Sequence, residues 1–369
     1  MLLNSSKMKG SYQEHKSVFD IIIIGGGITG STTAIMLQKL GYKTLILEKT
    51  NLKIFKPGES LSPQCKGYFS SLDLCFDENE VIEYYGINSV WDTNETAISN
   101  FIYNPYGNGL AIDRTNLETK LINKSINLGC EVKLSHSIEE CYYQNDIWYL
   151  NTGSKTGKQA FKANFVILAT GRTLFQQLNR SKNIYFDKLI SYSVLFENKN
   201  HNDHFLHVEA LSNGWFYSNS IPGGKTIVSF LTDNDIGPKL SGDTEIFTEM
   251  IKQTNWHKKN SSHLPLDSTL IISDARTKWV QDQSGTGWLR LGDAAYTIDP
   301  LSGQGIMKNF EMTLMVIDSV NLFLNNNKNV HRDYHEYNRT NFLQYLAQRQ
   351  LTYKRVERWS ENIFWKRRN

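Results

Sequence analysis

One stretch constrains the fold more than any other: residues 19–50 read FDIIIIGGGITGSTTAIMLQKLGYKTLILEKT. Ile21–Ile24 form an uninterrupted β-branched run, which is typical of a strand buried on both faces. Ala34 and Leu37 then recur at helical spacing, and Thr44–Leu47 predict a second strand. The stretch is therefore expected to fold as strand, turn, helix and strand, the opening unit of an α/β sheet.

The glycines of this unit form the pattern G-x-G-x-x-G at Gly25, Gly27 and Gly30. The first glycine permits the tight turn, the second lets a pyrophosphate approach the backbone, and the third lets helix and strand pack closely. Free N–H groups at the helix start would bind the phosphates. Glu48 ends the second strand, where its carboxylate would bind a ribose diol and disfavour a 2′-phosphate, so we expect FAD or NAD rather than NADP. The predicted contacts here are Gly25, Gly27, Ile28, Thr29, Gly30, Glu48 and Lys49.

The composition fits a soluble globular protein with a sizeable core, since 40% of the 369 residues are hydrophobic and 21% are charged. A formal net charge of +3 does not indicate a nucleic-acid partner. The four cysteines form no C-x-x-C pair, and no metal site is expected. No apolar run approaches the roughly 20 residues that span a bilayer. We expect a flexible lead at 1–17, no membrane partner and a cytoplasmic location.

Three further motifs follow the first unit in a fixed order. Asp113 and Arg114 open an amphipathic helix, and the strand FKANFVIL ends in 169–171, Ala-Thr-Gly. Residues 291–306 read LGDAAYTIDPLSGQGI. With the first glycine cluster, this order resembles the FAD-dependent monooxygenase superfamily, which includes aromatic hydroxylases, flavin-dependent halogenases and geranylgeranyl reductases. The resemblance covers roughly residues 18–325.

The resemblance implies a Rossmann-like FAD-binding domain, a β-sheet substrate domain and C-terminal helices. Arg114 would lie along the FAD, and the Ala-Thr-Gly turn near its adenine half. Asp293 would bind the ribityl chain or pyrophosphate, and 300–305 would lie against the isoalloxazine ring, with a helix N-terminus directed at its N1 and C2=O. The implied contacts in this part of the site are Ser60, Arg114, Ala169, Thr170, Gly171, Asp293, Pro300, Gly303, Gly305 and Ile306.

The segment 184–270 changes to alternating apolar and polar residues, as in SYSVLFE, GWFYSNSI and KTIVSFLT. Such alternation predicts antiparallel strands, which would roof the substrate side of the flavin. The expected division is an FAD-binding domain at 18–64, 105–183 and 271–325, a substrate domain at 65–104 and 184–270, and a C-terminal helical region at 326–369.

Two features separate the chain from the halogenases. The loop PGESLSP resembles a flavin-flanking segment of halogenases and their relatives, but no lysine occurs between Lys66 and Lys120 to carry an oxidised halogen. In NGWFYSNSIPGG, Tyr217 and Asn219 stand where halogenases have tryptophans. These features and the ending VERWSENIFWKRRN resemble the flavoproteins that mature cysteine tryptophylquinone oxidases such as glycine oxidase and lysine ε-oxidase.

That branch implies a monooxygenase that hydroxylates a tryptophan in a partner oxidase precursor, with O2 as co-substrate. The single nucleotide fingerprint leaves the electrons to a transiently bound reduced nicotinamide or to a reductase. Hydroxylation of a free aromatic metabolite, reduction of a prenyl chain, halogenation and a non-catalytic chaperone role remain alternatives. The oligomeric state stays open.

Candidate catalytic groups outside the flavin motifs are Glu59, His207, Glu209 and Asp299. His207 and Glu209 lie two residues apart and so share one face of a strand, where they would act on a substrate or form a solvated face. Asp299 would reach the substrate or cap the next turn. The aromatic residues 215–217 would stack on an indole or form hairpin core, and the basic residues 366–368 would be a solvated end or a docking site.

Overall fold

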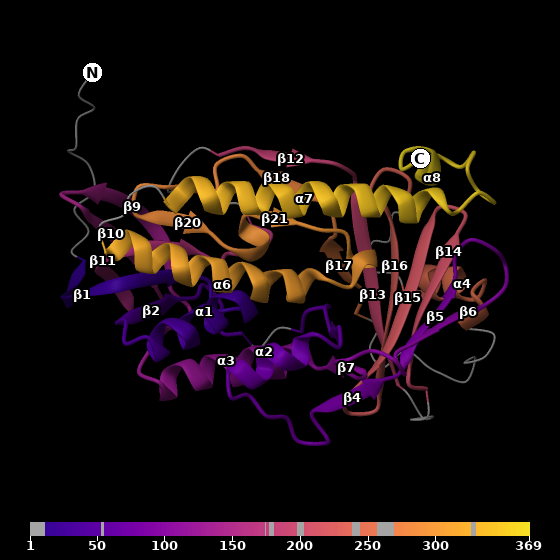
Figure 1. Cartoon of the computed structure of the whole chain (residues 1–369), viewed down its shortest axis with the longest axis horizontal. Coiled ribbons are helices and arrows are strands. Elements are labelled where there is room, and N and C mark those ends of the chain that lie inside the picture. Colours follow the sequence, from indigo (N-terminus) through magenta and orange to yellow (C-terminus); the bar gives the residue numbers. More distant parts are fainter. Residues whose placement is uncertain are drawn as a thin grey trace.

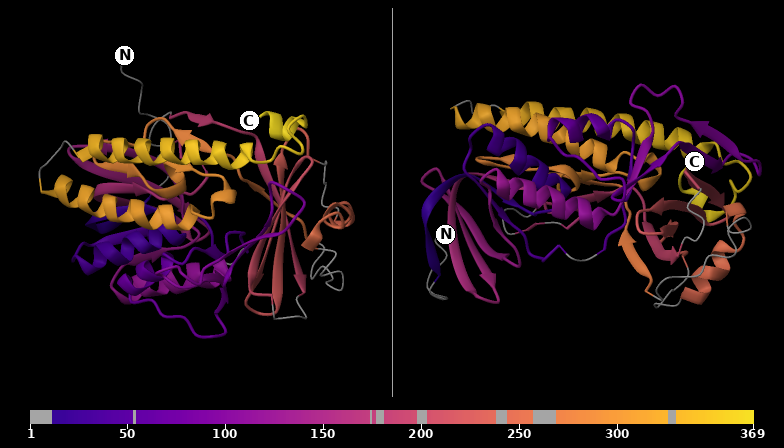
Figure 2. Two further views of the ribbon diagram at one scale, coloured as in Figure 1. Left: turned by 45° about the vertical axis from the view of Figure 1, so that its right-hand side comes forward. Right: turned by 90° about the horizontal axis from the view of Figure 1, so that it is seen from below.

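The computed structural model describes residues 12–52, 55–173, 175–176, 181–197, 203–237, 244–256, 269–325 and 330–369. Most of the expected lead, residues 1–11, lies outside the described residues. Two large sheets form the body of the molecule, and a pair of long helices runs beside them (Figures 1 and 2).

The first sheet has eight strands and contains the glycine-rich unit. Strand β1 pairs in parallel with β2 on one side and with β11 on the other. Strand β2 in turn pairs in parallel with β8, and β11 pairs in parallel with β20. This arrangement confirms the Rossmann-like α/β prediction. In spatial order the strands are β19 (Ser284–Gly285), β20 (Trp288–Arg290), β11 (Gly157–Leu168), β1 (Gln13–Ile24), β2 (Thr44–Leu47) and β8 (Glu131–Lys133), with β9 (Ser137–Gln144) and β10 (Ile147–Ser154) attached through β11.

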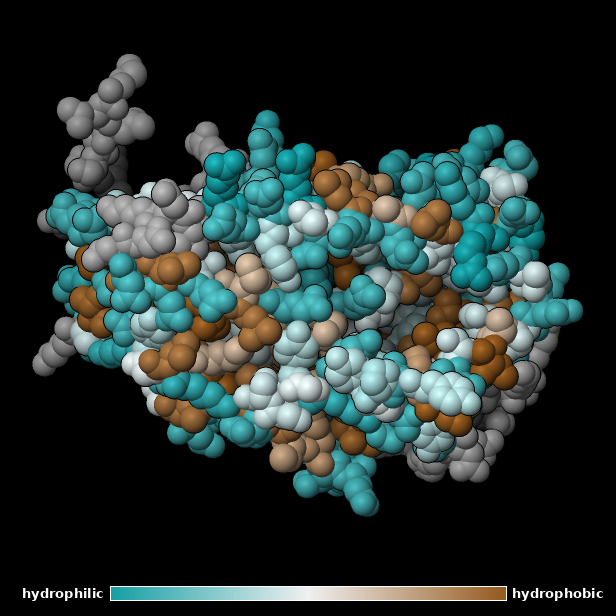
Figure 3. Space-filling view, in the orientation of Figure 1, coloured by the Kyte–Doolittle hydropathy of each residue, from teal (hydrophilic) through white to brown (hydrophobic). Residues whose placement is uncertain are grey.

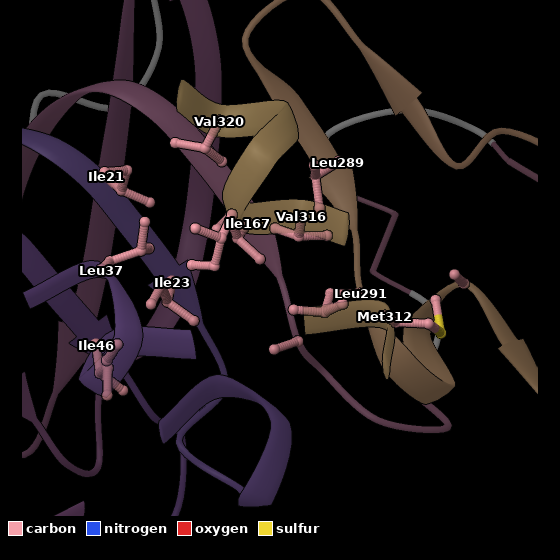
Figure 4. Close-up of a cluster of buried hydrophobic side chains, with 14 of the residues drawn as sticks. Ile21, Ile23, Leu37, Ile46, Ile167, Leu289, Leu291, Met312, Val316 and Val320 are labelled. Carbon is pink, nitrogen blue, oxygen red and sulfur yellow. The ribbon is translucent and has the colours of Figure 1, made fainter. Parts of the chain in front are cut away.

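The β-branched run of β1 is buried on both faces, as expected. On one face Ile21 and Ile23 pack with Leu37 of α1 and with Val316 of α6 (Figure 4). On the other face Ile22 packs with Trp148, Phe161 and the rest of the β9–β11 meander. Apolar surface on both sides of one strand fixes the sheet between two layers.

The second large sheet has seven strands, and those at 189–233 confirm the antiparallel strands predicted within 184–270, whereas Thr244–Ile251 forms a helix. Its order is β17 (Ile271–Asp274), β13 (Leu189–Glu197), β16 (Lys225–Asp233), β15 (Gly214–Ile221), β14 (Phe205–Leu211), β5 (Gly86–Val90) and β6 (Ala97–Asn100). Strands β5 and β6 join it from the earlier segment 65–104. Strand β17 pairs with β13, so residues 271–274 belong to this sheet.

Two small sheets and the helices connect these bodies. The small sheets are β3 (Ser60–Leu61), β7 (Gly109–Ile112) and β4 (Val81–Tyr84), and β12 (Asn183–Tyr185), β18 (Lys278–Val280) and β21 (Tyr296–Thr297). The helices are α1 (Ile28–Lys39), α2 (Cys65–Ser71), α3 (Arg114–Asn127), α4 (Thr244–Ile251), α6 (Gly305–Leu324), α7 (Val330–Lys354) and α8 (Ile363–Lys366), with short 3₁₀ turns at η1 (Gly292–Ala294) and η2 (Pro300–Ser302).

Helix α7 extends from the eight-stranded sheet to α8, beside the seven-stranded sheet (Figure 1). On the face seen in Figure 3, hydrophobic side chains occur as scattered groups among hydrophilic ones. On α6, Leu314 and Leu322 are exposed. Within the described ranges, no helix is both long and apolar enough to cross a membrane.

Candidate active site

The three glycines of the first motif have different reasons to lack a side chain. Gly25 has φ +111°, and a Cβ there would lie 2.3 Å from the Ala169 carbonyl oxygen. A Cβ on Gly30 would lie 1.9 Å from the Gly25 carbonyl oxygen. Next to Gly27 the nearest atom is a carboxylate oxygen of Glu118, 3.7 Å from the Cβ position. Packing therefore demands glycine at Gly25 and Gly30, whereas the space beside Gly27 is open to a ligand.

Helix α1 begins beside that open space without a capping side chain. Its N-cap, Gly27, makes no side-chain hydrogen bond, so the first N–H groups of the helix remain available. Glu48 is buried at the end of β2, where its carboxylate accepts from Gly26 N and from Thr50 N, each at 2.8 Å. The glycine turn and the acidic residue are thus held in one rigid unit, with Lys49 exposed beside it.

The late motif 291–306 packs directly on the first one. Gly292 has φ +65°, and a Cβ there would lie 3.0 Å from the Thr29 side chain of α1. Ala169 follows β11 and donates its N–H to Ile24 O at 2.8 Å, beside the glycine turn. Gly171, at φ +65°, follows in the same turn. Segments far apart in sequence therefore meet at the carboxyl ends of β1 and β11, where α/β sheets bind ligands.

Asp293 lies among several cations in this turn. Lys308 Nζ is 2.8 Å and Arg172 Nε is 3.7 Å from its carboxylate. Burial raises the pKa of Asp293, but the charges of Lys308 and Arg172 outweigh burial and lower the pKa to about 2. The carboxylate therefore stays ionised. Lys308, on α6, is itself buried and also donates to Tyr296 O at 2.6 Å.

Arg114 holds the loop that carries PGES. Its guanidinium donates to Pro57 O at 2.9 Å and to Glu118 at 3.1 Å. Gly58 has φ +114°, and a Cβ there would lie 2.8 Å from Arg114 Nη1. Asp113 caps α3 by accepting from Thr115 N at 2.8 Å, as the Asp-Arg helix start predicts. The loop after β2 is thereby fixed against α3.

The start of α6 is open in the same way as the start of α1. Gly303 has φ +61°, and no atom lies within 4 Å of a Cβ placed on Gly303 or Gly305. The N-cap Gln304 makes no side-chain hydrogen bond. Pro300, which precedes this helix start, is exposed, and Ile306, in the first turn of α6, is half-buried. A helix of 20 residues thus presents free N–H groups and the positive end of its dipole to open space.

These observations fit an FAD. Two uncapped helix starts suit the pyrophosphate and the flavin N1–C2=O edge, and the open space beside Gly27, Gly303 and Gly305 leaves room for the backbone to meet a ligand. Within the described residues, no cluster of histidine, cysteine, aspartate and glutamate is arranged to hold a metal ion.

Asp299 has a structural role in this site. Its carboxylate caps η2 by accepting from Leu301 N at 2.9 Å, and it also accepts from the Tyr353 hydroxyl at 2.7 Å and from Arg349 Nε at 3.3 Å. The side chain is 1% exposed. The capping interpretation of Asp299 thus agrees with its contacts, which shape the turn before α6.

His207 and Glu209 lie on the face of the seven-stranded sheet that is turned away from these motifs. Glu209 stands opposite Phe216, which packs on Trp256, and it accepts from Asn255 N at 2.8 Å. His207 lies 2.7 Å from Asp203. Because side chains alternate along a strand, this face is opposite to the one that carries Tyr217. The structure does not bring His207 and Glu209 to the other candidate residues.

Glu59 and Ser60 instead meet Tyr217 of the seven-stranded sheet. The Tyr217 hydroxyl donates to Glu59 and hydrogen-bonds to Ser60, and Asn219 Nδ2 donates to Ser60 Oγ at 2.7 Å. Glu59 also accepts from Gly58 N at 2.9 Å. The two hairpin positions that differ from halogenases thus contact the PGES loop directly. Sequence spacing gave no indication of this contact.

The other hairpin aromatics and the C-terminal tail are core. Trp215 is buried with Tyr353 and Trp365, and Phe216 packs beneath α4. The expectation of a solvated basic end is wrong for Arg368, which is 6% exposed and pairs with Asp233 of β16. The buried ion pair and the aromatic cluster fasten the tail to the seven-stranded sheet.

Comparison with known proteins agrees with this site. A family model described as FAD dependent oxidoreductase matches residues 20–53. The FAD-dependent oxidoreductase LodB of Marinomonas mediterranea is 22% identical to the chain, over 95% of this chain and 97% of LodB. The flavin-dependent halogenase armH3 of Armillaria mellea is 25% identical, over 46% of this chain and 35% of armH3.

Solved structures share the whole fold. The myxobacterial chondrochloren halogenase CndH has a TM-score of 0.84 at 20% identity, covering 96% of this chain and 86% of CndH. The peptidyl tryptophan dihydroxylase QhpG, essential for tryptophylquinone cofactor biogenesis, has a TM-score of 0.78 at 18% identity, covering 95% of this chain and 79% of QhpG. At these identities the likeness concerns the fold.

The fold, the paired glycine motifs and the family model define an FAD-dependent oxidoreductase with the monooxygenase and halogenase fold. Within this class, the chain resembles the FAD-dependent monooxygenase superfamily, and it is similar to LodB along nearly the whole length of both proteins.

Proposed function

We propose that the protein is an FAD-dependent monooxygenase that hydroxylates a tryptophan in a partner oxidase precursor during cysteine tryptophylquinone biogenesis. The similarity to LodB, which extends over 97% of that protein, supports the placement near the maturation flavoproteins. The shared fold with a peptidyl tryptophan dihydroxylase supports a substrate that is a side chain of another polypeptide.

The observation that carries the proposal is the contact between the hairpin and the PGES loop. Tyr217 and Asn219, which replace two halogenase tryptophans, bind Glu59 and Ser60. No lysine occurs between residues 66 and 120 to carry an oxidised halogen. The missing lysine favours hydroxylation over halogenation, and the polar network at this junction suits the movement of the proton that the ring releases on hydroxylation.

Different residues of the chain would bind different parts of the FAD. Gly27 and the start of α1 would bind the FAD pyrophosphate, Glu48 the ribose, and the start of α6 at Gly305 the flavin edge. When bound, reduced FAD supplies the activation of O2 for transfer of one oxygen atom to the substrate. The N–H groups of α6 would stabilise negative charge at that edge, and the apolar residues around the junction would limit the access of water.

The hydroxylation also needs a source of electrons and a product for the second oxygen atom. Hydroxylation of a ring consumes O2 and two electrons with two protons, and one oxygen atom leaves as water. We assign the electrons to a reduced nicotinamide that binds transiently or to a partner reductase, because the chain has one G-x-G-x-x-G fingerprint and it belongs to the FAD.

Co-expression of an oxidase precursor with and without this protein tests the proposal. The tryptophan-bearing peptide is expected to gain oxygen, measured by mass, only when the protein is present with an intact Gly27. Oxygen on the peptide in the absence of the protein, or none in its presence, would exclude the proposal. Turnover of free aromatic compounds with an unmodified precursor would favour a small-molecule hydroxylase instead.

A further inference from the structure

A buried carboxylate, Glu59, lies at the junction between the PGES loop and the seven-stranded sheet, and no cation pairs with it among the residues that the structure describes. Glu59 is 2% exposed, and its hydrogen bonds come from Gly58 N and from the hydroxyls of Ser60 and Tyr217. The nearby cations Lys56 and Arg114 pair with Glu118 instead. A buried charge is costly unless a positive group or a proton reaches it. The Glu59 carboxylate is therefore the acceptor on which the hydrogen bonds of this junction converge.

The Tyr217 hydroxyl is the donor that faces this carboxylate. Burial and the neighbouring Glu59 raise the pKa of Tyr217 well above its usual value, so the phenol keeps its proton at neutral pH. Ser60 Oγ accepts from Asn219 Nδ2 at 2.7 Å, and this hydrogen bond fixes the serine beside the Tyr217 hydroxyl and the Glu59 carboxylate. The four side chains thus form a directed chain of hydrogen bonds that ends on Glu59.

Two packed clusters connect this chain with the segment where α6 begins. Tyr217 belongs to the same packed cluster as Leu301, which lies in the turn before that helix. Leu61, next to Ser60, packs in one cluster with Ile306 of the first turn of α6. Tyr217 is half-buried, whereas Glu59 lies behind it. A substrate ring between the helix start and the sheet would therefore meet Tyr217 before Glu59.

We propose that Tyr217 and Glu59 form the proton relay of the hydroxylation, with Ser60 and Asn219 as positioning residues. The inference rests on the proposed function. When the C–O bond forms on the ring carbon, the O–O bond breaks and the second oxygen atom leaves as water. The ring carbon then loses its hydrogen as a proton to Tyr217 Oη, and the C–H electron pair restores the aromatic ring. The Tyr217 hydroxyl proton passes to Glu59 Oε1. The two electrons that reduce the second oxygen atom to water come from the reduced nicotinamide or the partner reductase.

Two variants interrupt the relay at different atoms, and a third serves as a matched control. Tyr217→Phe removes the hydroxyl and Glu59→Gln removes the acceptor charge. Tyr84→Phe removes another buried hydroxyl, which donates to Leu61 O at 2.9 Å in the same loop region. Each purified protein is tested for melting temperature without FAD, for FAD affinity, and for nicotinamide-driven oxygen transfer to the precursor.

Tyr217→Phe and Glu59→Gln are expected to lower kcat for oxygen transfer by about 100-fold or more, the contribution usual for general acid–base catalysis. KM and FAD affinity should stay within about threefold of the wild-type values, and the double variant should be no slower than the slower single variant, since both act in one relay. Tyr84→Phe should lower the melting temperature and leave kcat within about threefold, because it breaks a hydrogen bond of structure only.

The relay is overturned if Tyr217→Phe keeps the wild-type kcat. It is also overturned if the lower kcat of Tyr217→Phe is explained by weaker FAD binding. That second outcome would show that Tyr217 only pins the loop to the sheet. If the wild-type protein adds no oxygen to the precursor, the proposed function fails, and the relay fails with it. A wild-type protein that hydroxylates beside an equally active Tyr217→Phe variant refutes the relay alone.

Discussion

Replacing Gly27 with alanine separates the binding of FAD from the stability of the fold. Gly27 has φ −72° and ψ −172°, an extended conformation that any residue adopts. An added Cβ would meet its nearest atom at 3.7 Å, an ordinary van der Waals contact. The free energy of unfolding of the FAD-free protein should therefore change by less than about 1 kcal/mol.

The same methyl group would stand where a phosphate oxygen must approach the backbone. A hydrogen bond to a charged group contributes about 1.5–3 kcal/mol, so loss of one should weaken FAD affinity by about 10- to 150-fold. Gly30→Ala is the contrasting variant. Its Cβ would lie 1.9 Å from the Gly25 carbonyl oxygen, and we expect destabilisation of the apoprotein by about 3 kcal/mol.

The assay combines chemical unfolding of the FAD-free proteins with titration of FAD, followed by the change in flavin fluorescence. The account requires Gly27→Ala to be stable and weak in FAD binding, and Gly30→Ala to be unstable. If Gly27→Ala binds FAD with wild-type affinity, the pyrophosphate does not lie at Gly27 and the placement of the cofactor is refuted.

Three further predictions concern stability. Lys308→Met should lower the free energy of unfolding by about 3 kcal/mol at pH 7, measured by urea denaturation, because it leaves Asp293 without its nearest cation. In the wild type, the folded-state pKa of Asp293 is lowered to about 2, so the ionised carboxylate stabilises the fold above about pH 4. This contribution to the free energy of unfolding is lost as the pH falls toward 2, and Asp293→Asn should remove this part of the pH dependence. Trp365→Ala should cost about 3–5 kcal/mol in the same assay, whereas Lys366→Ala, at an exposed side chain, should cost less than about 0.5 kcal/mol.

The cofactor half of the site was accessible from sequence because its requirements are local. Gly25 and Gly30 are glycines for backbone reasons that a strand–turn–helix imposes at fixed spacing. The order of the later motifs then indicated that residues 291–306 return to the same turn, and the Gly292–Thr29 contact shows that return. Alternation likewise predicted the strands of the second sheet.

The substrate half was less accessible because it depends on which face of a sheet points inward. Alternation correctly put His207 and Glu209 on one face, but it carries no information on which side of the sheet the cofactor lies. Tyr217 lies on the other face, and its partners are far away in sequence. The Lys308–Asp293 pair was missed for a similar reason, since a lysine in an apolar helix gives no indication of its partner.

The C-terminal tail shows how charge misleads when it is read alone. The run Lys366, Arg367 and Arg368 has the composition of a solvated end, and Lys366 is indeed exposed. Arg368 is buried because Asp233 supplies a carboxylate inside the aromatic cluster. A buried cation needs such a partner, and only the packed structure reveals it.

The central claim is that this flavoprotein inserts oxygen into a tryptophan of a protein. Purified protein, FAD, a reduced nicotinamide or reductase, and an oxidase precursor are incubated under isotopically labelled dioxygen, and the tryptophan peptide is analysed by mass spectrometry. The account predicts labelled oxygen on the tryptophan with the wild-type protein and little with Gly27→Ala. Reduced FAD that consumes dioxygen while the peptide remains unlabelled would contradict it.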